Sequence, residues 1–93
     1  MNNNGHYSHD EVAARINQFI TKQLLYDVEN VAIDNDTKLI EQGIVDSMGL
    51  FRLMAFMEEE FDVEVEPDAI VLENFETVNA VATLITNTKL AHI

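Results

Sequence analysis

Apolar residues recur at helical spacing near the start of the chain. Their steps place them on one face of an α-helix, and the set is Val12, Ile16, Phe19, Ile20 and Leu24. Ser8 and Glu11 come just before them in the S-x-x-E pattern of a capping box, in which each side chain satisfies a backbone donor of the first turn. The pattern predicts an amphipathic helix of about 15 to 18 residues that begins at Ser8.

A second apolar face follows Ser47. It consists of residues three or four positions apart, namely Leu50, Leu53, Met54, Met57 and Phe61. At about 100° per residue, the opposite arc of the same helix carries a mixed apolar and charged set: Met48, Phe51, Arg52, Ala55, Glu58 and Glu59. We therefore predict a helix from Ser47 to about Phe61, with a core face and an outer face.

The last third of the chain contains a shorter periodic stretch. Thr77 can cap a helix that runs to about Lys89, and its apolar stripe is Val78, Val81, Ala82 and Ile85. Before it, residues 62–66 alternate acids with valines, and we expect an extended connector whose Val63 and Val65 pack inward. Pro67 is suited to the first position of a short helix over residues 68–72, which residues 74–76 should break.

The segment between the first two helices, residues 27–46, has no helical period and is long for a connection. We expect it to be an ordered loop held by Val31, Ile33, Leu39 and Ile44, with Gly43 supplying a conformation or a close approach that suits a residue without Cβ. The predicted fold is all-α, with three longer helices, one short helix and a long first loop. Residues 8–90 would form the domain, residues 1–7 a disordered leader and residues 91–93 a tail.

The net charge of this domain limits the kinds of partner that it can bind. The 93 residues include 17 acids and 5 bases, for a formal net charge of −12. Nucleic acid and anionic membranes carry the same sign, so we expect neither as a partner and expect basic protein surfaces instead. No apolar run approaches the roughly 20 residues of a membrane span, and there is no cysteine. We expect a cytoplasmic monomer, too small for a deep catalytic cleft.

Ser47 is the candidate functional residue because it opens a helix directly after Asp46. The unpaired N–H groups and the positive end of the dipole at that point would favour a phosphate esterified to the hydroxyl. We expect Ser47→Ala to cost about 0.5 to 2 kcal/mol if the serine caps the helix.

Other chemistry is weakly supported by the residues. A hydrolase that uses Ser47 would need a rigidly held histidine base, whereas His6, His9 and His92 lie near the termini. Their spacing also argues against a metal site. The run from Asp34 resembles the start of a calcium loop but lacks its glycine and its final glutamate. We therefore predict neither catalysis nor a bound metal.

The string Gly43-x-x-Asp46-Ser47-Met48 resembles the signature of the acyl carrier protein family, Asp-Ser-Leu or Asp-Ser-Met. The resemblance extends over residues 12–90 and implies a four-helix bundle of acyl-carrier type. It also implies that a phosphopantetheinyl transferase attaches 4′-phosphopantetheine from coenzyme A to Ser47, with Asp46 in support. Cargo would be carried as a thioester on the arm, and acyl- or aminoacyl-loading and processing enzymes with basic docking surfaces would be the other partners.

The outer face of the second helix would then be the partner face, defined as Met48, Phe51, Arg52, Ala55, Glu58 and Glu59. Carriers of fatty acid synthesis typically have acids two and five residues after the serine, where this chain has Gly49 and Arg52. The difference favours a stand-alone carrier for a specialised pathway, such as polyketide, nonribosomal peptide or aminoacyl transfer. Three alternatives stay open: a carrier for primary fatty acid synthesis, an unmodified acidic adaptor in which Ser47 is only a helix cap, and a small enzyme.

Overall fold

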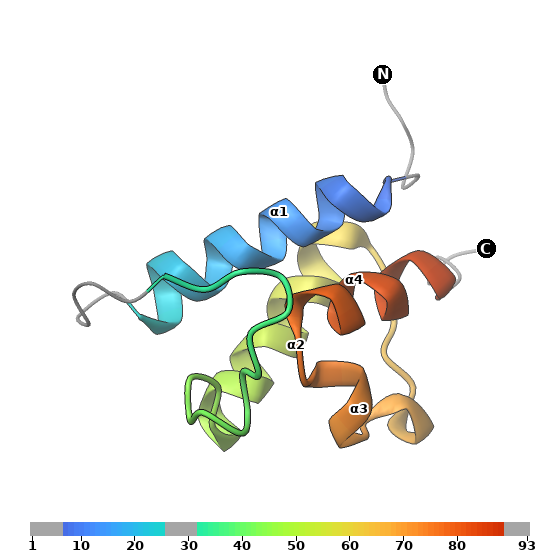
Figure 1. Cartoon of the computed structure of the whole chain (residues 1–93). Helices are drawn as coiled ribbons and strands as arrows, with labels where there is room; N and C mark the ends of the chain where they lie inside the picture. The colour runs from blue at the N-terminus through green and yellow to red at the C-terminus, as the bar shows by residue number, and fades with distance from the viewer. Residues whose placement is uncertain (1–6, 26–31, 89–93) are drawn as a thin grey trace.

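Four α-helices surround one apolar core in the computed structural model, which describes residues 7–25 and 32–88 (Figure 1). Three are long and one is short, as predicted: α1 (His9–Phe19), α2 (Ser47–Phe61), α3 (Leu72–Phe75) and α4 (Val78–Asn87). A π-helical segment, η1 (Ile20–Leu24), continues α1, and a 3₁₀ turn, η2 (Pro67–Ala69), precedes α3. None of the helices in the described ranges has the length and apolarity needed to span a bilayer.

The first helix begins at Ser8 as predicted, but only the Ser8 half of the predicted capping box forms. The Ser8 side chain accepts a hydrogen bond from the Glu11 N–H at 3.1 Å, while the Glu11 carboxylate pairs with Arg15 at 3.5 Å. With η1 added to α1, the helical segment has the predicted length, but its last turn widens, since the Leu25 N–H donates to the Ile20 carbonyl at 3.0 Å. Val12, Ala13, Ile16 and Ile20 are buried, and this face of α1 packs on α4.

The second helix buries the predicted face only in part. Leu53, Met57 and Phe61 are buried, whereas Leu50 and Met54 are half-buried at its margin. Full burial of each such side chain contributes roughly 1.5 to 3 kcal/mol. Phe56 was not predicted as a core residue, yet it packs against the core and stacks on Phe19 with ring centroids 4.3 Å apart.

The connector after α2 packs inward as predicted, with Val63 buried and Val65 half-buried against the core. The predicted short helix that opens at Pro67 is confirmed for its first turn only. The chain makes the 3₁₀ turn η2, extends at Val71 and only then forms α3, so Asn74 lies inside a helix instead of ending one. Burial of Phe75 explains this later start, and the Asn74 side-chain amide joins the two turns by donating to the Ala69 carbonyl at 2.8 Å.

The last helix is capped by Thr77, whose side chain accepts from the Ala80 N–H at 3.0 Å, and its predicted apolar stripe is buried. It ends at Asn87 because Thr88 is extended. Lys89, predicted to lie in its last turn, falls outside the described residues.

The described part of the loop before α2, from residue 32, is held to two helices by hydrogen bonds. Leu39 is fully buried, and its N–H donates to the Glu76 carbonyl at 2.8 Å. The N–H of Asn79 donates to the Asn35 carbonyl at 3.0 Å, while the Asn17 side chain donates to the Ile33 carbonyl at 3.1 Å. Ile33 and Ile44 pack against the core as predicted, whereas Val31 lies outside the described residues.

Tyr7 was predicted to belong to a disordered leader, and this was wrong for that residue. Its ring meets Phe61 edge to face with centroids 5.1 Å apart, and the Arg15 guanidinium lies 5.2 Å from the ring centre. The rest of that leader, residues 1–6, and the predicted tail, residues 91–93, lie outside the described residues.

Candidate functional site

The chain reaches α2 through a turn at Gly43. This glycine has a φ of 75°, in the left-handed region that residues with a Cβ rarely adopt, and an added Cβ would meet no atom within 4 Å. Backbone conformation, not a close approach, is therefore the reason for glycine here. The N–H groups of Ile44 and Val45 then both donate to the Leu39 carbonyl, at 2.8 and 3.0 Å, which fixes the entry into α2.

Asp46 caps α2. Its backbone is extended, with φ −99° and ψ −170°, and its Oδ1 accepts from the Gly49 N–H at 2.8 Å. Ser47 is the first residue of the helix itself. The capping role that the adaptor alternative gives to Ser47 is therefore wrong, because the Asp46 side chain satisfies the Gly49 N–H.

The Ser47 hydroxyl is left available by this arrangement. Ser47 is exposed, and within the described parts of the chain its hydroxyl forms no hydrogen bond. It lies beside the first turn of a 15-residue helix, where unpaired backbone N–H groups favour negative charge by about 0.3 to 1 kcal/mol. The site is thus a solvent-accessible hydroxyl held at a fixed position on a rigid helix.

Gly49 faces inward instead of toward partners. It is buried, and an added Cβ would lie 3.3 Å from the capping Oδ1 of Asp46 and 3.5 Å from Cδ1 of Leu24. A longer side chain at this position would have to displace Leu24. Gly49 and Arg52 stand where carriers of fatty acid synthesis typically have acids. Of these two residues, only Arg52 lies on the outer face of α2.

The six residues of the partner face are all exposed on α2. Met48 and Phe51 are the most exposed large apolar residues there, at 70% and 66%. Glu58 also has a structural contact, since its carboxylate accepts from the Val65 N–H at 3.1 Å. The helical spacing thus identified a contiguous exposed surface that begins beside Ser47.

A second exposed apolar surface was missed. It lies between η2 and the start of α3 and consists of Ile70, Val71 and Leu72, with Leu72 58% exposed. These residues were predicted to belong to the short helix after Pro67. Three consecutive apolar residues without helical spacing were the available signal.

The other candidate chemistry is not assembled in the structure. Across residues 7–25 and 32–88, no three His, Cys, Asp or Glu side chains are grouped as a metal site would require. His9 Nε2 instead lies 3.3 Å from the Asn79 carbonyl and 3.3 Å from the Thr83 hydroxyl, while His6 and His92 are outside those ranges.

The stretch that resembles a calcium loop forms a small turn around Asp34. The Asp34 carboxylate accepts from the Asp36 N–H at 2.9 Å and from the Thr37 hydroxyl at 3.1 Å. These two hydrogen bonds hold the pKa of Asp34 below its ordinary value of 3.8.

Comparison with known proteins agrees with this geometry. Residues 14–85 match the family described as the phosphopantetheine attachment site. The chain is 35% identical over 74 residues to the probable acyl carrier protein PigG of Serratia sp. (strain ATCC 39006), covering 80% of this chain and 83% of that protein. It also resembles the structure of KstB-PCP in its apo form, with a TM-score of 0.59 and 28% identity over 84% of this chain and 86% of the other.

These matches define a phosphopantetheine-binding domain on a helical bundle. The chain belongs to the acyl and peptidyl carrier proteins. Its prosthetic group is therefore covalently attached 4′-phosphopantetheine. Carriers of this type work with a phosphopantetheinyl transferase and with biosynthetic enzymes, and they are generally not catalysts themselves.

Proposed function

We propose that Ser47 is the residue that receives the phosphopantetheine arm, and that the chain carries acyl or aminoacyl intermediates on this arm without catalysing a reaction itself. The observation that supports the proposal most directly is the division of roles at the start of α2. Asp46 satisfies the Gly49 N–H, so the exposed Ser47 hydroxyl is not needed as a cap.

The residues at the site fit a phosphodiester. A phosphate on the Ser47 oxygen would lie at the N-terminus of α2, where the dipole and the free N–H groups favour an anion. Asp46 holds the turn through one carboxylate oxygen, and its exposed side chain can support the incoming donor at the transferase. The bound arm supplies a thiol, which holds the cargo as a thioester.

We further propose that the pathway is a specialised one, such as polyketide, nonribosomal peptide or aminoacyl transfer, and not primary fatty acid synthesis. The likeness to KstB-PCP, a peptidyl carrier protein by its abbreviation, supports this. So does the exposed Arg52, which puts a positive charge on an otherwise acidic partner face. A partner built for that face needs basic groups opposite Glu59 and an acid opposite Arg52.

Intact-mass measurement tests the attachment site. The chain has two serines, Ser8 and Ser47, so Ser8→Ala provides a matched control at the cap of α1. After incubation with coenzyme A and a phosphopantetheinyl transferase, the parent and Ser8→Ala should gain the mass of one phosphopantetheine. Ser47→Ala should gain none, and an adduct on that variant would refute the proposal.

A further inference from the structure

We propose that Leu24 is a positioning residue for the loading of Ser47. Its side chain covers the hydrogen bond with which Asp46 caps α2, and it thereby fixes the carboxylate beside the serine. This role rests on the proposed function, in which Ser47 receives the arm. Leu24 belongs to η1 and acts on the serine only through Asp46 and Gly49.

The capping hydrogen bond lies in a partly apolar surrounding. Asp46 is itself exposed, yet its bond to the Gly49 N–H is half-buried and Gly49 is buried. A Cβ added at Gly49 would lie 3.5 Å from Leu24 Cδ1 and 3.7 Å from Val45 Cγ1. It would also lie 3.3 Å from the capping Oδ1 of Asp46. The two methyl groups and the capping oxygen therefore surround one small space, from which the methyl groups exclude water.

The π-helical turn at the end of α1 leaves Leu24 available for this role. In a regular α-helix, Leu25 would lie about 140° around the axis from Ile20 and would point away from the core. In η1 the Leu25 N–H donates to the Ile20 carbonyl at 3.0 Å, so Leu25 follows Ile20 inward and is buried. Leu24 is half-buried beside it, with its Cδ1 toward Gly49 of α2. The widened turn thus supplies one leucine to the core and another to the cap.

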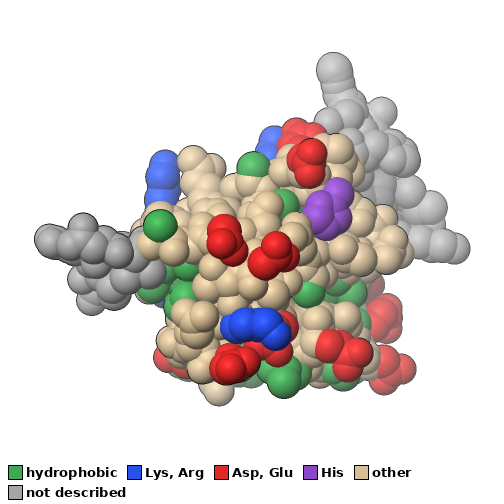
Figure 2. All heavy atoms as spheres, in the orientation of Figure 1, with side chains coloured by type: hydrophobic (Ala, Val, Ile, Leu, Met, Phe, Trp, Pro, Cys, Tyr) green, Lys and Arg blue, Asp and Glu red, His purple; other side chains and the backbone are tan. Residues whose placement is uncertain are grey.

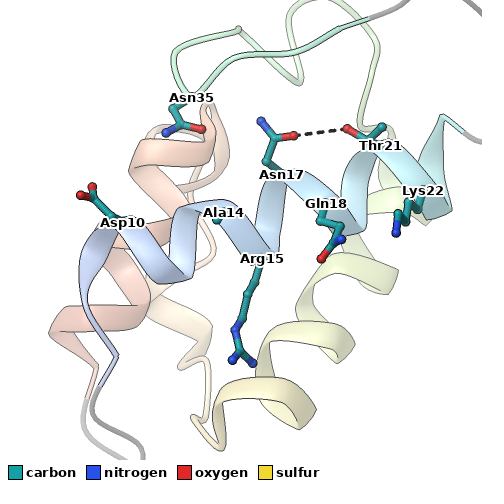
Figure 3. Close-up of a pocket in the computed structure, with 8 residues that line it drawn as sticks. All are labelled: Asp10, Ala14, Arg15, Asn17, Gln18, Thr21, Lys22 and Asn35. Carbon is teal, nitrogen blue, oxygen red and sulfur yellow. Dashed lines mark hydrogen bonds between the residues drawn. The ribbon is translucent and has the colours of Figure 1, made fainter.

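Polar contacts hold η1 on its other side. The Asn17 side chain donates to the Ile33 carbonyl at 3.1 Å and accepts from the Thr21 hydroxyl at 3.3 Å. Figure 3 shows Asn17 and Thr21 on the side of the helix toward the loop, where both line a hollow of about 660 Å³. These bonds join η1 to the loop that leads to α2. The position of Leu24 relative to Gly49 is therefore fixed from both sides.

The orientation of the cap matters for loading because the reacting oxygen belongs to the next residue. In that reaction the Ser47 oxygen displaces adenosine bisphosphate from the phosphorus of coenzyme A and releases its proton. Without the Leu24 methyl groups, water can compete with Asp46 for the Gly49 N–H, and the first turn of α2 loosens. A misplacement of about 1 Å can lower a rate roughly 100-fold.

Initial rates of loading on the full chain, with coenzyme A and a phosphopantetheinyl transferase, test this role. Leu24→Ala removes the covering methyl groups, and Leu84→Ala is the matched control, since Leu84 is a half-buried leucine of α4. We expect Leu24→Ala to lower kcat/KM roughly 10-fold, mainly through kcat because the partner face is unchanged, and Leu84→Ala to lower it less than about twofold. Leu24→Met keeps a long apolar side chain and should restore most of the rate.

Hydrogen exchange of the Gly49 N–H, measured by NMR, gives a readout that does not depend on attachment. Leu24→Ala should speed this exchange, because water reaches the capping bond. The Ala80 N–H, which is the equivalent donor at the Thr77 cap of α4, should exchange in that variant as in the parent. Unchanged exchange at Gly49 would show that Leu24 does not cover the cap.

The rates separate the positioning role from the proposed function. Equal losses of kcat/KM in Leu24→Ala and Leu84→Ala, or no loss in Leu24→Ala, would overturn the role of Leu24 and leave the attachment at Ser47 intact. Absence of an adduct on the parent would overturn the proposed function and the positioning role together. If Leu24→Ala did not fold, Leu24→Val, which has no δ carbon, would replace it with Leu84→Val as its control.

Discussion

Because Asp46 and not Ser47 caps α2, we expect Asp46→Ala to be less stable than Ser47→Ala. In Asp46→Ala the Gly49 N–H loses its partner at 2.8 Å, and the N-terminus of a 15-residue helix loses a negative charge. Loss of a cap costs about 0.5 to 2 kcal/mol, and the charge contributes about 0.3 to 1 kcal/mol. We expect Asp46→Ala to lower the free energy of unfolding by about 1 to 2 kcal/mol.

Ser47→Ala should behave differently. The hydroxyl is exposed and makes no hydrogen bond within the described residues, and alanine is the better helix former. We expect a change within about 0.5 kcal/mol, which replaces the larger loss expected when the serine was taken as the cap. Asp46→Asn keeps a capping oxygen without the charge, so its loss should be only about 0.3 to 1 kcal/mol.

Thermal unfolding of the protein without its arm, followed by circular dichroism, measures all three variants. For a domain of this size, 1 kcal/mol corresponds to roughly 4 to 8 °C in Tm. Asp46→Ala should therefore melt at least about 4 °C below the parent, and Ser47→Ala close to it. A Ser47→Ala variant that melts below Asp46→Ala would refute the capping geometry.

Leu39→Ala should reduce the free energy of unfolding by about 2 to 5 kcal/mol in urea titrations, because the fully buried side chain leaves a cavity under the loop; a loss below 1 kcal/mol would contradict its role as the anchor. Added salt should raise Tm, since ten of the acids lie between Asp46 and Glu76 and the Debye length falls from about 10 Å at 0.1 M to about 3 Å at 1 M; a Tm independent of salt would show that repulsion is unimportant. The lowered pKa of Asp34 means that its stabilising contribution is present above 3.8 and is lost as the pH falls through the lower folded value, which NMR titration of its carboxyl group would show. Arg52→Glu should change the free energy of unfolding by no more than about 0.5 kcal/mol while weakening binding to its own pathway enzymes and strengthening binding to a fatty-acid-synthesis enzyme; unchanged affinity for both would place recognition elsewhere.

Periodicity predicted the long helices well because their burial follows the 3.6-residue repeat. Ser8 and Thr77 were recognised as caps since side-chain oxygens there accept from N–H groups three residues on, a local interaction that the sequence displays directly. The same local logic failed at α2, where two adjacent residues, Asp46 and Ser47, could each act as the cap. Only the backbone geometry distinguishes them.

The remaining errors arise from contacts between residues far apart in the sequence. Burial of Phe75 against the core shifted α3 toward the C-terminus, and stacking on Phe19 drew Phe56 inward. Gly49 was interpreted as a missing surface acid, although its side of α2 meets Leu24. The sequence predicts on which side of a helix a residue lies, but it does not predict which distant element packs against that side.

Few basic side chains interrupt the acidic ones on the face seen in Figure 2, and that face includes part of the loop before α2. This loop has a consequence for synthesis on the ribosome. The hydrogen bond between the side chains of Asp36 and Asn79 joins residues 43 positions apart, and Leu39 bonds to the backbone of Glu76. A nascent chain is made N-terminus first, so Ser47 is synthesised before the residues that close its loop. The turn that presents the serine can thus be locked only in a chain translated beyond α3, and a truncated product would lack these two bonds.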